Sequence, residues 1–316
     1  MISYLLRRLQ LAVLVLLGIS IFAFSLVRLV PGDTVTALLG PRYTEEEAER
    51  LRERYGLDRS LAVQYGLWLG QAVRWNLGES SFTGQPVARA IGERLPVTLQ
   101  LTTMAAALAL FLGLPLGVVA ALRHRRPADY LASSCALLGV SIPPFWLGTM
   151  LILLFSLLLG WLPSGGFVGL SEDPLNNLRH MLMPALALGA VVMAVVMRMT
   201  RSSLLEVLGR DYVRSAMARG VPFRVVVWRH ALRNALVPVL TVLGIQVGYL
   251  IGGSVVIEQV FALPGLGRLL LQAITNRDYA LVQGVILFIG AAFVLLNLLV
   301  DLVYAVVDPR IRYGSD

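Results

Sequence analysis

The sequence predicts an all-α membrane protein with six transmembrane helices and a long helical extracytoplasmic loop after the first helix. Hydrophobic residues make up 57% of its 316 residues and charged residues only 15%, whereas soluble domains are about 25% charged. Six apolar stretches come close to, or exceed, the roughly 20 residues with which a helix crosses a bilayer. The single cysteine, Cys135, excludes a disulfide within the chain. These observations exclude a soluble enzyme, a secreted disulfide module and a disordered chain.

The six stretches cover residues 9–30, 98–122, 131–160, 181–198, 235–256 and 281–306. Strands of a membrane barrel would be much shorter and would alternate in polarity, so we expect helices. The first stretch is too long for the core of a signal peptide, and it ends at Pro31-Gly32-Asp33 without a small-residue cleavage site. We therefore expect a single transmembrane domain over residues 1–316.

The distribution of arginine predicts the direction in which the helices cross the membrane. With the N-terminus inside, the inner segments carry 15 arginines, eight of them between Arg198 and Arg233, and the short outer segments carry 4. Short loops rich in arginine stay in the cytoplasm, whereas long loops such as 31–97 lie outside this rule. We expect both chain termini to be cytoplasmic.

The outer loop, residues 31–97, is too long for an unstructured connection and carries helix signals. Thr44 and Glu47 have the spacing of a capping box, and Gly56 can end the helix that they open. A second helix is predicted over residues 61–75, with an apolar face made of Leu61, Tyr65, Trp68 and Leu69. That face can rest on the membrane or on the transmembrane helices, and a docking platform for a partner is an equally open alternative.

The inner loop, residues 198–234, predicts a helical elbow. A helix is expected to begin at Ser202 or Ser203 and to end at Gly220, and a new helix to begin at Pro222. Four charged side chains decorate the elbow, namely Arg210, Asp211, Arg214 and Arg219. Such an elbow suits docking to another protein, but the arginines can equally serve only to fix the topology.

The centres of the transmembrane stretches lack Asp, Glu, Lys, Arg and His, which disfavours a proton-driven carrier. Two stretches nevertheless contain groups that predict a translocation path. In the third, two prolines force a bend whose freed carbonyl groups need partners or water, among Ser141, Pro143, Pro144, Phe145 and Trp146. In the fifth, Gln246 and Tyr249 lie one turn apart. Glu258 beyond them can attract a substrate amino group at the outer mouth, and a solvated loop carboxylate is the commoner alternative. Helix packing is the competing interpretation of the bend and of the small residues near Gln246.

The basic residues exclude further classes of chemistry. All 27 are arginine, and a P-loop needs a lysine, so this chain cannot hydrolyse ATP by that route. The three histidines lie in different segments, which is poor material for a metal site. The net charge of +8 does not indicate nucleic-acid binding, because the arginines lie mainly between apolar runs. We expect that this chain is not an enzyme, binds no metal and has no nucleic-acid partner.

A series of short motifs extends along the whole chain. Before residue 100 they are Ser3-Tyr4-Leu5-Leu6-Arg7-Arg8-Leu9, Pro31-Gly32-Asp33, Tyr55-Gly56-Leu57-Asp58-Arg59, Gln64-Tyr65 and Arg94-Leu95-Pro96-Val97-Thr98-Leu99. The most specific motifs lie in the inner loop. They extend from Arg198-Met199-Thr200-Arg201-Ser202-Ser203 through Glu206 to Tyr212, and continue with Ala218-Arg219-Gly220 and residues 230–238. The last are Pro264-Gly265-Leu266-Gly267-Arg268, Arg277-Asp278-Tyr279 and Asp308-Pro309-Arg310-Ile311-Arg312. In this order they resemble the B-type membrane permeases of dipeptide, oligopeptide and nickel ABC importers.

The resemblance implies a type I importer permease whose elbow is the cytoplasmic coupling loop, with a short helix that inserts into a cleft of an ATPase subunit. It assigns this contact to Asp211, Tyr212, Ser215, Ala216, Arg219, Gly220 and Val221. The chain departs from the broad ABC pattern where Arg214 replaces a glutamate and Arg233 a proline, so single ion pairs to the ATPase are not carried over. Thr34 replaces the last proline of a Pro-Gly-Asp-Pro motif.

The resemblance also implies an assembly in the plasma (inner) membrane of a prokaryote. Its expected members are a second, similar permease, two ABC ATPase subunits that carry ATP and Mg, and an extracytoplasmic substrate-binding protein, all among membrane lipid. This chain would carry no cofactor and would form half of a path for di- and oligopeptides, with nickel chelates and glutathione as other cargoes of such permeases. A self-sufficient channel or carrier for a small solute is the alternative. A membrane enzyme is disfavoured because no span pairs catalytic groups.

Overall fold

The computed structural model describes residues 2–28, 44–47, 49–50 and 59–307. Four helices of this part of the chain are long and apolar enough to cross a membrane, and two further pairs of helices pass the same test as bent pairs, which gives six spans if each pair is one. The prediction of an all-α membrane fold is confirmed. The four straight segments are Leu6–Leu26, Val87–Leu122, Pro174–Leu208 and Tyr279–Val300.

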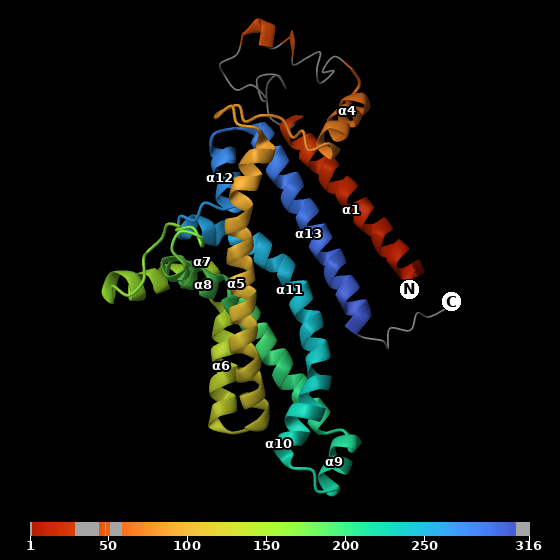
Figure 1. Ribbon diagram of the computed structural model, residues 1–316, viewed down its shortest axis with the longest axis vertical. Helices are drawn as coiled ribbons and strands as arrows, with labels where there is room; N and C mark the ends of the chain where they lie inside the picture. Colours follow the sequence, from red (N-terminus) through yellow and green to blue (C-terminus); the bar gives the residue numbers. More distant parts are fainter. Residues whose placement is uncertain (1, 29–43, 48, 51–58, 308–316) are drawn as a thin grey trace. The chain divides into compact units, whose positions relative to one another are not determined.

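The helices divide between two compact units. Unit 1 comprises residues 1–98 and 264–298. Its helices are α1 (Ile2–Arg28), α4 (Leu61–Val73), the start of α5 (Val87–Leu122), α12 (Leu266–Thr275) and most of α13 (Tyr279–Val307) (Figure 1).

The core of unit 1 joins α5, α12 and α13. Val87, Ile91, Leu266 and Val285 are almost fully buried in one apolar cluster. The Thr98 hydroxyl accepts a hydrogen bond from the Leu266 backbone N–H at 2.9 Å and so caps the start of α12. The short helix α12 is an element that hydropathy did not predict, because ten residues are too few to cross a membrane.

Helix α4 rests on α1, as one interpretation of the outer loop predicts. The rings of Tyr65 and Trp68 lie 5.3 Å and 5.7 Å from the ring of Phe24, and the Tyr65 hydroxyl is 2.6 Å from Ser20 Oγ. Leu61, expected on the same face, is 63% exposed. The capping box is confirmed as well: Thr44 N–H donates to Glu47 Oε2 at 2.8 Å and Glu47 N–H to Thr44 Oγ1 at 3.3 Å. The expected end of that helix, Gly56, lies outside the described residues.

Unit 2 comprises residues 99–263 and 299–316. After the remainder of α5 it contains α6 (Pro127–Ser141), α7 (Pro144–Leu151), a π-helical continuation η1 (Ile152–Leu158), α8 (Pro174–Leu208), α9 (Asp211–Ala218), α10 (Phe223–Val225), a second π-helical segment η2 (Val226–Ala231) and α11 (Leu232–Val260). The core helix is α8, because 67% of its apolar 18-residue stretch is buried within this chain.

Small residues allow α5, α6 and α8 to approach closely. A Cβ at Gly117 would lie 2.6 Å from Thr200 Cβ, and a Cβ at Gly113 would lie 2.8 Å from the Met193 carbonyl oxygen. Gly113 and Gly117 have the four-residue spacing at which membrane helices commonly pack. An apolar cluster of three alanines and one methionine extends this contact to α6, namely Ala120, Ala136, Ala194 and Met197. Contact between these helices therefore depends on backbone proximity.

Three predicted spans need correction. The third is not one helix, because the chain leaves helical geometry at Ile142 and Pro143 and turns by 107° between α6 and α7. The second begins at Val87 rather than near residue 98. Its first turns carry the ion pair of Arg89 with Glu93 at 3.0 Å. Such a pair stabilises a helix, but its charged residues end the apolar stretch from which the span was predicted. The fifth span is also bent, by 46° at residue 247.

Candidate coupling and translocation site

The inner loop folds into an elbow of short helices at the end of α8. The prediction that a helix begins at Ser202 or Ser203 is wrong, because α8 continues through both serines to Leu208. The break falls nearly two turns later, at Gly209 and Arg210, and α9 follows. Sequence reasoning missed this break because the apolar periodicity continues across it.

The predicted end of the elbow helix at Gly220 is confirmed. Gly220 has φ +80°, its N–H donates to the Met217 carbonyl at 2.9 Å, and Val221 N–H donates to the Ala216 carbonyl at 3.2 Å. These two bonds form a Schellman motif, which requires a left-handed residue after the C-cap and favours glycine there. Pro222 then stands immediately before α10, as predicted. The elbow thus has a defined backbone path.

Helix α9 has a buried face and an exposed face. Val213 and Ala216 are buried against Val226 of η2. Of the seven predicted coupling residues, Ala216 therefore points inward and Val221 is half-buried beside it. The other five are exposed, namely Asp211, Tyr212, Ser215, Arg219 and Gly220. The exposed face of α9 is thus the part of the elbow that a partner could contact.

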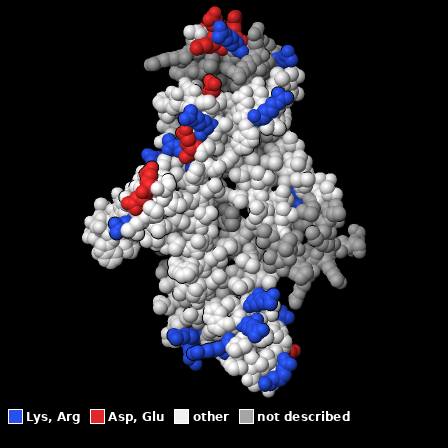
Figure 2. Space-filling view, viewed as in Figure 1, with Lys and Arg blue, Asp and Glu red and all other residues white. Residues whose placement is uncertain are grey.

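Polar contacts hold the exposed face in place and leave it basic. The Tyr212 hydroxyl accepts a hydrogen bond from Asn234 Nδ2 at 2.9 Å, which ties α9 to α11. Arg219 Nε donates to the Ser215 carbonyl at 3.3 Å. Figure 2 shows the blue arginine side chains gathered at the α9 end of unit 2. This surface can attract acidic groups of a partner.

A buried carboxylate ties the turn between α5 and α6 to α8. Asp129, 2% exposed, accepts hydrogen bonds from Arg201 Nε at 2.6 Å and from Arg201 Nη2 at 2.9 Å. The Arg125 N–H, in a residue with φ +60°, donates to the same carboxylate at 3.0 Å. His124 Nδ1 lies 3.2 Å from Asp129 Oδ2. No local pattern in the sequence pairs Asp129 with an arginine 72 positions away.

The proline bend lies where predicted. Ser141 closes α6 with its hydroxyl bonded to the Leu137 carbonyl at 2.9 Å, and Pro143, in extended conformation, opens α7. Pro144 is half-buried, whereas Phe145 and Trp146 are 50% and 47% exposed. Two large aromatic side chains are thus presented on the outside of this chain at a break in a membrane helix.

The predicted polar residues of α11 differ in their surroundings. Gln246 is half-buried and Tyr249, one turn later, is 42% exposed. Glu258 is wholly buried in the last turn, where its carbonyl accepts a hydrogen bond from Leu263 N–H at 2.8 Å. Glu258 is therefore not a solvated loop carboxylate but a side chain buried within this chain.

Phe261, which follows α11 and was not singled out from the sequence, is fully buried and joins three segments. A Cβ at Gly148 of α7 would lie 2.9 Å from its ring, and one at Gly165 would lie 2.6 Å from its carbonyl oxygen. The Gly166 N–H donates to that oxygen at 2.9 Å. The helix after the proline bend is thus packed directly on the end of α11.

No cluster of three or more His, Cys, Asp or Glu able to hold a metal occurs among the described residues.

Chains of two solved ABC transporters have this fold. A chain of the MetNI methionine ABC transporter aligns with a TM-score of 0.55 at 20% identity, covering 69% of this chain and 96% of that chain. A chain of an amino acid ABC transporter solved with histidines aligns with a TM-score of 0.51 at 17% identity, covering 77% and 98%.

Residues 113–313 match the family "Binding-protein-dependent transport system inner membrane component", and residues 1–102 match its N-terminal family. The chain belongs to this family and is a membrane-embedded permease of an ABC importer. It is 40% identical to the dipeptide transport system permease protein DppB of Alkalihalophilus pseudofirmus, over 99% of this chain and 100% of the relative. It is 39% identical to the oligopeptide transport system permease protein AppB of Bacillus subtilis, with the same coverage. A Brucella abortus protein named provisionally as a peptide permease is 47% identical, again with 99% and 100% covered.

Proposed function

We propose that this chain forms half of the membrane pathway of an ATP-driven importer of di- and oligopeptides, with no catalytic activity of its own. The relatives named above are peptide permeases that match over their full length, which supports the cargo class. The absence of lysine from the chain supports the assignment of ATP hydrolysis to other subunits. ATP and Mg would therefore be bound by ATPase partners.

The observation that carries the proposal is the elbow. An exposed, basic α9 is held by the buried contacts of Val213 and Ala216, so a force applied to α9 would be transmitted to η2. Beside it, Arg201 of α8 is bonded to Asp129 of α6, which would carry the same motion to the α5–α6 turn. ATP-driven closure of two ATPase subunits would then shift the equilibrium between inward and outward access.

The remaining partners follow from the same proposal. A second, similar permease would complete the pathway, and an extracytoplasmic binding protein would deliver the peptide near the 31–97 loop. We propose that both termini and the elbow are cytoplasmic, as the 15 inner arginines against 4 outer ones favour.

Copurification from native membranes tests the proposal. Tagged chain in mild detergent should retain a second permease and P-loop ATPases, identified by mass spectrometry. Arg214→Glu, on the exposed side of α9, should reduce the retained ATPase about tenfold, the equivalent of roughly 1.4 kcal/mol. Arg179→Glu, an equally exposed arginine at the other end of α8, is the matched control and should retain it fully. A chain that elutes without any ATPase would contradict the proposal and favour a self-sufficient channel or carrier.

A further inference from the structure

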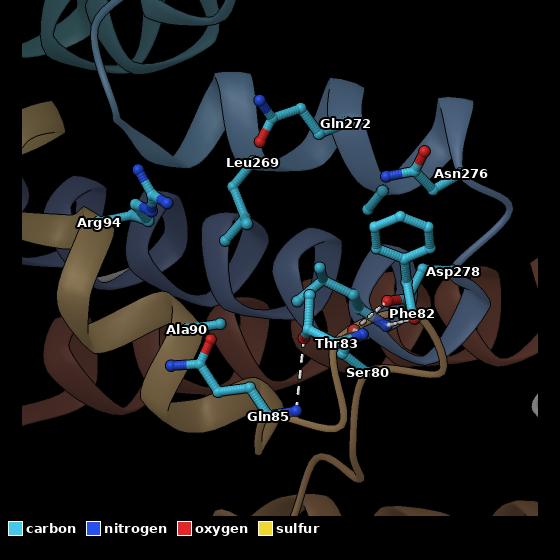
Figure 3. A pocket seen from close by; sticks show the side chains of 12 residues that line it. Ser80, Phe82, Thr83, Gln85, Ala90, Arg94, Leu269, Gln272, Asn276 and Asp278 are labelled. Carbon is cyan, nitrogen blue, oxygen red and sulfur yellow. Dashed lines mark hydrogen bonds between the residues drawn. The ribbon is translucent and has the colours of Figure 1, made fainter.

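Unit 1 contains a pocket that the elbow and the proline bend do not involve. It encloses about 320 Å³ between the loop before α5, the first turns of α5, helix α12 and the start of α13 (Figure 3). This volume is at the lower end of the range for small-molecule sites, about 300–1,000 Å³. It suits a ligand group the size of one or two amino-acid residues.

The wall formed by the loop is rigid. Asp278, 1% exposed, accepts hydrogen bonds from the Ser80 hydroxyl, from Ser81 N–H at 3.3 Å and from Leu281 N–H at 3.2 Å. Ser80 N–H donates to the Gln85 carbonyl at 2.9 Å, which closes the loop on itself. The Asp278 carboxylate caps α13 and fixes the loop, so its oxygens are already occupied by donors of this chain. The pocket is therefore formed before a ligand arrives, and Asp278 is not free to bind an ammonium group.

The remaining charge in the pocket is positive. Arg94 of α5 lines it and is half-buried, yet its guanidinium makes no hydrogen bond or salt bridge within the described part of the chain. Arg89, on the same helix, differs because it is paired with Glu93 at 3.0 Å. A partly desolvated guanidinium with unused donors is a strong site for a carboxylate.

The other walls supply amide groups and an apolar floor. Gln272 of α12 and Asn276, the C-cap of that helix, supply side-chain amides, and Leu269 and Ala273 of α12 form the apolar part. Figure 3 shows Arg94 rising from α5, Leu269 descending from α12 beside it, and the ring of Phe82 standing below Asn276. Phe82 is 69% exposed, so it is placed to cover a ligand rather than to fill the core.

We propose that this pocket binds the C-terminal residue of a peptide, with the carboxylate on Arg94, the peptide group on the amides of α12 and the side chain over Leu269 and Ala273. The inference rests on the proposed peptide-importer function and adds a peptide site in unit 1, made of other residues than those predicted for the translocation path. The pocket offers one cation, Arg94, next to an apolar surface, which fits a ligand with a single carboxylate. A phosphate group would need several cations. The fixed Asp278 excludes the opposite orientation, with the peptide N-terminus inside.

The test is calorimetric titration of the purified chain, in whichever assembly it elutes, with Ala-Ala-Phe as free acid and as C-terminal amide, without the binding protein. The free acid should bind at least tenfold more tightly than the amide. Arg94→Gln should abolish that difference, since a hydrogen bond to a charged group is worth about a factor of ten or more. Phe82→Ala, at an exposed position that does not threaten folding, should weaken both peptides severalfold. Arg89→Gln is the matched control and should change neither affinity.

Equal affinity for acid and amide, or an unchanged acid affinity in Arg94→Gln, would overturn the peptide site. So would an Arg94→Gln variant that loses only its association with an extracytoplasmic binding protein, because the pocket would then hold a protein carboxylate. Each of these results leaves the importer function intact as long as ATPases still copurify. Loss of the ATPases from the wild-type chain would instead count against the proposed function.

Discussion

Arg201 of α8 and Asp129 of α6 form a two-point ion pair, with Nε 2.6 Å from Oδ1 and Nη2 2.9 Å from Oδ2. The side chain of Asp129 is 3% exposed and the side chain of Arg201 is 27% exposed. The pair joins segments 72 residues apart at the place where α8 continues toward the elbow. It is the strongest polar contact between α6 and α8 that the described residues show.

Asp129→Ala should destabilise the chain by about 2 kcal/mol, because it leaves Arg201 without its partner. The loss is smaller than the roughly 3–5 kcal/mol of a fully buried pair, since Arg201 remains partly exposed. The apparent melting temperature in detergent, followed by tryptophan fluorescence, measures the change. Glu206→Ala removes the exposed pair with Arg210 and should cost less than about 1 kcal/mol. Equal effects of the two variants would show that the Asp129 pair is not structural.

Gly117→Ala and Gly92→Ala should change stability in opposite directions, although both lie on α5. A Cβ at Gly117 would lie 2.7 Å from the Met197 carbonyl oxygen, so α5 and α8 must separate, at a cost of about 1–3 kcal/mol. A Cβ at Gly92 would meet nothing within 4 Å, and alanine should stabilise the helix there by up to about 1 kcal/mol. The same melting experiment measures both. A Gly117→Ala variant as stable as the wild type would contradict the close packing.

Gly220→Ala should disturb the elbow through the backbone alone. No atom lies within 4 Å of a Cβ at this position, but φ is +80°, a conformation that costs an L-residue about 1–2 kcal/mol. We expect severalfold faster proteolysis between α9 and α10 and less ATPase retained on copurification. Gly209→Ala is the control, because φ at Gly209 is −79°. A Gly220→Ala chain that resists protease as the wild type does would disprove the strained turn.

Low pH should weaken the helix that begins after Thr44. The Thr44 backbone N–H, and next the Thr44 side chain, hold the pKa of the Glu47 carboxyl below its usual 4.5. A folded-state pKa that lies below the unfolded value stabilises the capped helix above the unfolded pKa, and the effect is lost as the pH falls through the folded pKa. Carbon-13 NMR titration of Glu47 in the full chain should give a pKa lower than in a peptide of residues 40–50. Identical values would show that the capping box does not form in solution.

The sequence predicted best what is encoded locally. Apolar runs located the spans, the spacing of Thr44 and Glu47 located a helix start, and Gly220 with Pro222 located the turn of the elbow. Each depends on neighbours within a few residues, where propensity and capping act directly.

Features that depend on distant partners were not predictable in the same way. Nothing near Asp129 indicates Arg201, and nothing near Phe261 indicates that Gly148 and Gly165 lie against it. The end of α8 was misplaced for a related reason, since burial of Leu204 against the neighbouring helices keeps the chain helical past two serines that could start a new helix. The pocket of unit 1 likewise combines residues from two segments that lie far apart in the sequence, 80–94 and 269–281.

The unbroken course of α8 beyond Pro184 gives the molecule a mechanical property. The 24 residues from Ala185 to Leu208 contain no further proline, which corresponds to a rod about 36 Å long at roughly 1.5 Å per residue. A rod of this length that pivots by about 5° at its membrane end moves its tip by about 3 Å, close to the diameter of a water molecule. A helix of that length converts small rotations among the membrane helices into displacements of atomic size at the elbow. In the reverse direction, a displacement of about 3 Å at the elbow corresponds to a rotation of about 5° of α8 in the membrane.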